Sequence, residues 1–139
     1  MRSIIIAALL IFPAFCLGQA GDNTAIRSSA AYAEVLVRKT EVQADLEAVS
    51  ADYTEANPKL LDLRFELSAL ERSTARILAT KPSEAAKLTL GVGKLFVKKA
   101  SLETEQARLL RSYGLEHPEV KRAKRRVEIF ENAINELIK

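Results

Sequence analysis

The sequence contains a single cysteine, Cys16, and no tryptophan. One cysteine cannot form an intramolecular disulfide, so the fold must be stabilised by packing or by self-association. Glycine and proline number only 5 and 4, and β-branched residues nowhere alternate with polar ones over the length of a strand. These absences argue against a disulfide scaffold and against a β-rich fold, and they favour an all-α protein.

The sequence also has only one histidine, His117. A metal centre needs several His, Cys, Asp or Glu ligands that converge, and His117 has no apparent partners. No serine has a nearby base, and several carboxylates are spread over a predicted solvent-facing helix side: Glu34, Glu41, Asp45 and Glu47. We therefore expect no catalytic site, no metal site and no cofactor, and we interpret the protein as not being an enzyme.

The first 20 residues indicate the compartment. Met1-Arg2 gives a short basic start, residues 4–17 form an interrupted apolar run, and Gly-Gln-Ala at 18–20 supplies the small residues that a signal peptidase requires. The run is shorter than the roughly 20 apolar residues of a membrane span. We expect a signal peptide at 1–20, no membrane span after its cleavage, and a periplasmic or secreted protein. Retention of this segment as an anchor is the alternative.

A shift of 60 residues aligns the rest of the chain with itself. The shift places Val35-Leu36-Val37-Arg38-Lys39 on Leu95-Phe96-Val97-Lys98-Lys99, and Tyr53, Pro58 and Glu71 on Tyr113, Pro118 and Glu131. Few residues are identical, but the apolar positions match almost throughout. The pattern predicts two copies of one unit, at residues 21–80 and 81–139.

Each unit carries two apolar stripes in alternating steps of four and three residues, which is typical of helices with a period near 3.5. The first stripe is Val35, Lys39, Val42, Leu46, Val49 and Tyr53, matched by Leu95, Lys99, Leu102, Gln106, Leu109 and Tyr113. The second is Leu60, Leu63, Leu67, Leu70, Thr74 and Ile77, matched by Val120, Ala123, Val127, Phe130, Ile134 and Leu137. The stripes predict two tandem antiparallel helical hairpins that form a four-helix or coiled-coil bundle.

The turn within each hairpin has its own signals. Gly114 is expected to end a helix in the left-handed conformation. Pro58 and Pro118 are expected to begin the next helices, where a missing N–H costs nothing. Asn57 and His117 precede these prolines and are predicted N-caps.

Two features interrupt the stripes. Gly91 and Gly93 are expected to bend or delay the third helix. Lys39 and Lys99 occupy matching positions within otherwise apolar stripes. A lysine there either extends its amine to water from the edge of the interface, which we favour, or fixes the register of the helices.

Around the predicted turns the sequence resembles a known family. Tyr53-Thr-Glu-Ala-Asn57-Pro58-Lys-Leu60 and Tyr113-Gly-Leu-Glu-His117-Pro118-Glu-Val120 lie between helical stripes. They are similar to the periplasmic helical segments of Wzz-type polysaccharide chain-length determinants and related exopolysaccharide export proteins. The resemblance implies a link to polysaccharide export and oligomerisation. Members of that family have transmembrane helices at both ends and an α/β base, which we do not find in this sequence.

One candidate partner-binding surface is apolar. Leu61 and Phe65 lie four residues apart on one helix face, and together with Phe96 and Leu110 they fall beside the stripes. We expect all four side chains to stay partly exposed. Burial of such a side chain is worth about 1.5 to 3 kcal/mol, so we predict a homo-oligomer that forms through the first hairpin.

The other candidate surface is a basic cluster, formed by Lys121, Arg122, Lys124, Arg125 and Arg126. It is either the solvated outer face of the last helix, which we favour, or a site for an anionic partner. Export argues against nucleic acid and toward an acidic polysaccharide, lipid headgroups or an acidic envelope protein.

Two classes of function fit these patterns. The first, which we favour, is a non-enzymatic protein of cell-envelope structure or assembly that acts through helix–helix contacts, with the link to polysaccharide export that the resemblance implies. The second is a small periplasmic chaperone of the Spy or Skp kind, which this chain resembles in being exported, basic, helical and free of cofactors. The Leu-Thr-x-x-Gln signature of the Spy group is absent, since residues 102–106 match it only in part.

Overall fold

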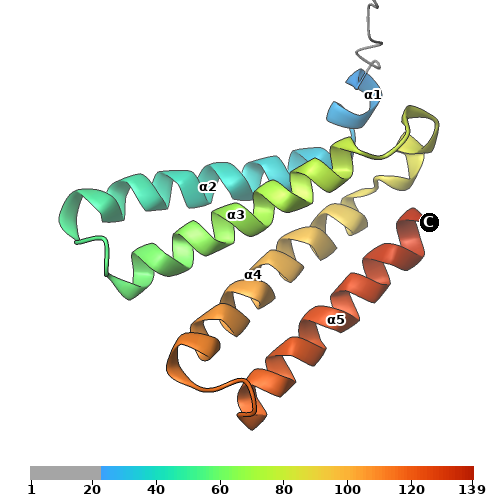
Figure 1. The fold of residues 1–139 in the computed structure, drawn as a ribbon. Coiled ribbons are helices and arrows are strands. Elements are labelled where there is room, and N and C mark those ends of the chain that lie inside the picture. The colour runs from blue at the N-terminus through green and yellow to red at the C-terminus, as the bar shows by residue number, and fades with distance from the viewer. Residues whose placement is uncertain (1–22) are drawn as a thin grey trace, which may run out of the picture.

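The computed structural model describes residues 23–139, and the predicted signal peptide at 1–20 lies outside the described residues. The helices are α1 (Thr24–Arg27), α2 (Ala30–Asp52), α3 (Pro58–Leu78), the 3-10 helix η1 (Pro82–Lys87), α4 (Leu90–Ser112) and α5 (Pro118–Ile138). Residues 23–139 contain no strand, and the long helices pack on one another (Figure 1). The prediction of an all-α fold is confirmed.

The long helices have matching lengths and ends. Helices α2 and α4 have 23 residues each, and α3 and α5 have 21 each. Their first residues are 60 positions apart, at Ala30 and Leu90 and at Pro58 and Pro118. The helix bounds therefore agree with the spacing of the sequence pattern. Duplication of an ancestral hairpin stays an interpretation of that pattern.

The helix starts also correspond. Ser29 caps α2 by accepting a hydrogen bond from the Tyr32 amide at 3.2 Å, and Thr89 caps α4 by accepting one from the Val92 amide at 3.4 Å. These side chains satisfy amides that have no partner within the helix. Since α4 begins directly after Thr89, the glycines that follow do not delay it.

The turn prediction is confirmed at the start of the second helix and wrong at the end of the first. Asn57 Oδ1 accepts from the Lys59 amide at 2.8 Å, and His117 Nδ1 accepts from the Glu119 amide at 3.3 Å. Gly114 is not left-handed, because no described residue has a positive φ. Tyr53 and Tyr113 instead end α2 and α4 in extended conformations. This exit needs no glycine, since Thr54 occupies the position equivalent to Gly114 in the first turn.

Helix α4 lies at the centre of the molecule. It packs against α2, α3 and α5, while α5 packs chiefly against α4. Figure 1 shows α2 and α5 on opposite sides, both hairpin turns at one end, and η1 with the C-terminus at the other. The first hairpin and α4 thus form one packed unit, and the two outermost helices each leave a face uncovered.

The central position of α4 overturns one prediction. Phe96 was expected to stay partly exposed, but only 1% of it is accessible to solvent. The predicted stripe that includes Leu95 and Leu102 explains only the packing of α4 against α5. A second row, which includes Val92, Phe96 and Ala100, is buried in the core that α4 shares with α2 and α3.

Gly93 permits the close approach of α4 to α2. A β-carbon placed on Gly93 would lie 2.8 Å from Ala31 Cα and 2.8 Å from Glu34 Cβ. Ordinary contacts between carbon atoms are about 3.5 to 4.0 Å. The crossing of these two helices therefore depends on the missing side chain.

Candidate interaction surfaces

The apolar residues predicted to bind a partner occupy a groove and its rim. Phe65 lines a groove of about 280 Å³ between α3, α4 and α5. The other lining residues are Arg72, Glu103, Gln106, Ala107, Leu110 and Val127. Leu61, one turn earlier on α3, is 37% exposed. The structure thus brings Phe65 and Leu110 together and keeps Leu61 accessible, whereas Phe96 is separate from them in the core.

Phe65 is covered on one side. The guanidinium of Arg72 lies 5.8 Å from the centre of its ring, a cation–π distance. Arg72 also donates hydrogen bonds to Ser68 at 3.0 Å and to Glu103 at 3.1 Å. Because Arg72 is fixed in this way, the free apolar surface at the groove is smaller than the sequence indicates.

The basic cluster of α5 is exposed, and most of its charges are paired. Its four ion pairs within the described residues are Lys121 with Glu116, Arg122 with Glu119, Lys124 with Glu128 and Arg126 with Glu105. Arg125 is the one residue of this cluster that makes no ion pair with another residue of 23–139. Exposed pairs of this kind are individually weak. They nevertheless lower the net positive charge that the cluster presents to an anion.

The two lysines within the apolar stripes make equivalent contacts. Lys39 on α2 lies 3.3 Å from Glu71 on α3, and Lys99 on α4 lies 3.3 Å from Glu131 on α5. The residues of one pair are each 60 positions from those of the other. Each lysine therefore joins the two helices of its own hairpin. The amines sit at the edge of the interface, beside partly exposed carboxylates.

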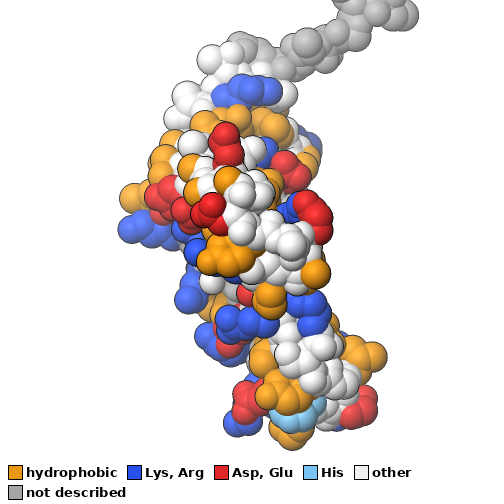
Figure 2. Space-filling view, turned by 90° about the vertical axis from the view of Figure 1, so that its left-hand side faces the viewer, with side chains coloured by type: hydrophobic (Ala, Val, Ile, Leu, Met, Phe, Trp, Pro, Cys, Tyr) orange, Lys and Arg blue, Asp and Glu red, His pale blue; other side chains and the backbone are white. Residues whose placement is uncertain are grey.

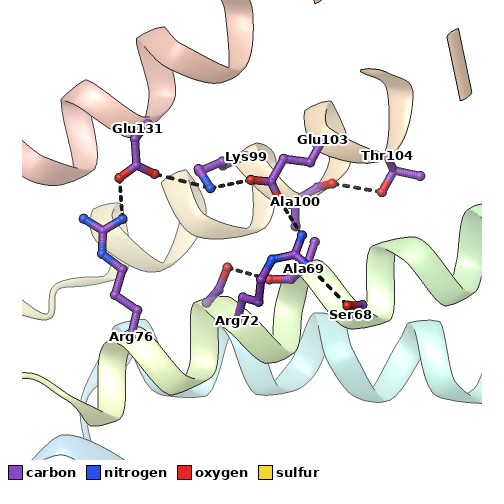
Figure 3. A network of polar contacts seen from close by, with 10 residues as sticks. Ser68, Ala69, Arg72, Arg76, Lys99, Ala100, Glu103, Thr104 and Glu131 are labelled. Carbon is purple, nitrogen blue, oxygen red and sulfur yellow. Dashed lines mark hydrogen bonds and ion pairs between the residues drawn. The ribbon is translucent and has the colours of Figure 1, made fainter. Parts of the chain in front are cut away.

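Lys99 belongs to a longer polar network that crosses three helices (Figure 3). Arg76 lies 2.7 Å from Glu131, Lys99 lies between Glu131 and Glu103, and Arg72 reaches Glu103 at 3.1 Å. Positive and negative groups alternate along this path from α3 through α5 and α4 and back to α3. The network closes the space between α3 and α5 at one end of the apolar groove.

The ionisation of Glu131 depends on this network. Burial on its own would raise the pKa of the carboxyl group, but hydrogen bonds and positive charge from Arg76 and Lys99 outweigh it. The pKa of Glu131 is therefore below its ordinary value.

A second charged contact fixes α2 to α3 beside α4. Arg38 approaches Glu66 at 2.7 Å and Glu41 at 3.1 Å. Burial alone would lower the pKa of Arg38, but the two carboxylates raise it above the ordinary value. This pair borders a cleft of about 390 Å³ lined by Glu34, Arg38, Glu66, Lys94, Val97, Lys98 and Ser101.

The outer faces of α2 and α5 were missed by the sequence analysis. On α2, Leu36 and Val37 are 46% and 59% exposed, and on α5, Ile129 and Leu137 are 64% and 50% exposed. Leu137 was assigned to a buried stripe, and that assignment is wrong; the neighbouring Ile138 packs against the core instead. The 60-residue shift places Leu36 on Phe96, but the burial of Phe96 is visible only in the structure, so no signal in the sequence alone marks these faces.

The turn end of the molecule has a mixed surface. The rings of Tyr113 and His117 stack with centres 4.2 Å apart, and Leu115 beside them is exposed. Figure 2 shows the pale-blue histidine next to apolar side chains at the lower end, with basic, acidic and apolar side chains interspersed over the rest of this face. This stack accounts for the solitary histidine as a cap and turn residue.

Within residues 23–139, no group of three or more His, Cys, Asp or Glu side chains is placed to hold a metal ion. Among the helices of that same range, none is both long and apolar enough to cross a membrane. No family model, curated protein or solved structure matches this chain.

Proposed function

We propose that the protein is an exported, non-enzymatic component of the cell envelope that acts in structure or assembly through helix–helix contacts. The observation that carries the proposal is the pair of apolar outer faces, at Leu36 and Val37 on α2 and at Ile129 and Leu137 on α5. Each face places large apolar side chains in water on a helix whose opposite side is buried. Such surfaces are typical of proteins that bind a partner.

The polar groups of the protein support the same proposal. The described arginines and lysines with the least exposed side chains, such as Lys99 and Arg76, join helices to one another. The basic cluster of α5 is largely paired within the chain. A helical or apolar partner therefore matches the surface better than a purely anionic one. A link to polysaccharide export follows only from the resemblance of the two turn segments.

In-cell photo-cross-linking tests the proposal. A photoreactive residue would replace Val37 or Ile129 in turn, with Lys81, an exposed residue between the hairpins, as the matched control. We expect discrete cross-linked products in the envelope fraction from the first two positions and none from Lys81. Absence of the protein from the envelope would contradict the proposal, as would equal products from all three positions.

A small chaperone is the competing function, and an aggregation assay separates it. A chaperone would suppress aggregation of an unfolding client at near-stoichiometric amounts and would give a continuum of cross-linked clients. An assembly protein would give few products and little suppression. Strong suppression together with diffuse cross-links would favour the chaperone.

A further inference from the structure

We propose that the partner of both outer faces is a second copy of this chain, with α2 of one copy docked on α4 and α5 of the next. This inference rests on the proposed function and deepens it by naming the partner. In this docking, α2 of one copy packs against α4 and α5 of the next copy in the same way that α4 packs against α2 and α3 inside one chain. Each residue of that internal contact has an equivalent 60 positions away in the other hairpin.

The internal contact has a receiving side on the first hairpin. Ala69 and Ser73 of α3 are buried although they lie outside the stripe predicted to pair α3 with α2, and Ile77 of that stripe is buried as well. The residues 60 positions later on α5 are, in the same order, Ile129, Ala133 and Leu137. Ile129 and Leu137 are largely exposed, while Ala69 and Ile77 are each 1% exposed. The second hairpin therefore presents the equivalent surface largely uncovered within residues 23–139, with Ala133 half-buried.

The internal contact also has an inserting side, on α4. Phe96 and Val97 of α4 correspond to Leu36 and Val37 of α2. Phe96 is fully buried in the core, and Val97 packs against it. Leu36 and Val37 are among the most exposed apolar residues described. Helix α2 therefore carries, uncovered, the face with which α4 enters the first hairpin. We call the surface around Leu36 and Val37 the α2 face. We call the surface around Ile129 and Leu137 the α4–α5 face.

The crossing point of the helices keeps its small residues. Inside the chain, Gly93 of α4 lies against Ala31 of α2. The equivalent contact between copies pairs Ala33 of α2 with Gly91 of α4. Both crossings join one glycine to one alanine. A β-carbon added to Gly91 would meet only Thr89 Oγ1, at 3.6 Å, so space for a close approach is present on this side of α4.

The charges at the two contacts are also complementary, with the signs exchanged. Inside the chain, the first hairpin contributes Glu34, Arg38 and Glu66 to the cleft, and α4 contributes Lys94, Lys98 and Ser101. Between copies, the equivalents of Glu34, Arg38 and Glu66 are Lys94, Lys98 and Arg126 on the α4–α5 face. The equivalents of Lys94, Lys98 and Ser101 are Glu34, Arg38 and Glu41 on the α2 face. Arg126 is paired with Glu105, and Arg38 with Glu41 and Glu66, inside the chain. Of these equivalents, the charges without an ion pair among residues 23–139 are therefore Lys94 and Lys98 on the α4–α5 face and Glu34 on the α2 face. Opposite charge on facing surfaces favours the proposed orientation.

The two faces are different, so the association is head to tail. Such a contact leaves one free face of each kind at the ends of an assembly and adds further copies until a ring closes or a filament grows. Stacked helical repeats use one interface many times in this way. The structure thus assigns the exposed residues of both faces to a single type of contact.

Sedimentation of two blocked variants and their mixture tests this inference. Leu36→Lys with Val37→Lys places positive charge opposite Lys94 and Lys98. Ile129→Glu with Leu137→Glu places negative charge opposite Glu34 and Glu41. We expect the wild type to associate as concentration rises and each variant alone to associate about tenfold or more weakly. An equimolar mixture should form a one-to-one pair, because each variant keeps the face that the other lacks.

Leu115→Lys is the matched control, since it changes an exposed leucine in the turn between α4 and α5, outside both faces. It should associate as the wild type does. Val37→Lys and Ile129→Glu are milder single variants that serve if a double variant fails to fold by circular dichroism. A monomeric wild type, or a mixture that forms no pair, would overturn the inference. Envelope cross-links retained by a monomeric wild type would leave the proposed function standing without it.

Discussion

Replacement of Gly93 by alanine should destabilise the protein because α2 and α4 touch at this residue. The added β-carbon would lie 2.8 Å from Ala31 Cα and 3.0 Å from Ala31 O. Both are backbone atoms, so relief requires the helices to separate by about 0.7 Å to reach an ordinary carbon contact. Overpacking of this kind costs about 1 to 3 kcal/mol. Alanine also raises helix propensity by about 1 kcal/mol over glycine, which offsets part of the cost.

Gly91→Ala is the control that separates these two effects. It brings a similar gain in propensity, and its β-carbon would meet nothing closer than 3.6 Å. In urea denaturation at low protein concentration, followed by the helical circular dichroism signal, we expect Gly93→Ala to be less stable than Gly91→Ala by about 1 to 3 kcal/mol. Equal stabilities would refute the close approach of α2 and α4, and with it the packing of α4 on the first hairpin.

Three further predictions concern the core, the polar network and the envelope. Phe96→Ala should lower the free energy of unfolding by about 3 to 5 kcal/mol, and Leu61→Ala by no more than about 0.5 kcal/mol, in the same denaturation assay; similar losses would mean that Phe96 is not in the core. The pKa of Glu131 lies below the ordinary 4.5, so its contribution to stability is present above pH 4.5 and is lost as the pH falls through the lower folded-state pKa. Glu131→Gln should therefore lose less stability than the wild type between pH 5 and 3, and parallel curves would contradict this. Deletion of the gene should alter the chain length or amount of surface polysaccharide, as measured by gel electrophoresis, and an unchanged pattern would remove the support that the resemblance gives to an export role.

Much of the helical structure could be predicted because its determinants are local. The prolines at 58 and 118 and the caps Asn57 and His117 act within one turn, so the starts of α3 and α5 are visible in the sequence. Gly114 misled the prediction because glycine permits a left-handed end without requiring one. The extended exit at Tyr113 repeats the exit at Tyr53, and that similarity was already present in the two turn segments.

The packing was harder to predict because a stripe specifies one partner for each helix. Phe96 lies outside the stripe that faces α5, so its burial becomes apparent only once α4 is known to contact the first hairpin as well. The candidate surface at Leu61 and Phe65 was found from spacing alone. Whether Leu61 and Phe65 bind a partner stays a prediction. The exposed apolar faces of α2 and α5 become apparent only when residues 60 positions apart are compared, one buried and the other exposed. Only the structure shows which residue of each pair is buried.

Zero-length cross-linking of an isotope mixture tests the central claim, that one copy continues the packing of the next. Unlabelled protein and protein labelled with heavy nitrogen would be mixed, activated with a carbodiimide and analysed by mass spectrometry. The account predicts mixed-isotope peptides that join Lys94 or Lys98 of one copy to Glu34 or Glu41 of another. Mixed-isotope links should be absent in the Leu36→Lys, Val37→Lys variant. Exclusively same-isotope links in the wild type would contradict the account, because those lysines would then meet only the carboxylates of their own chain.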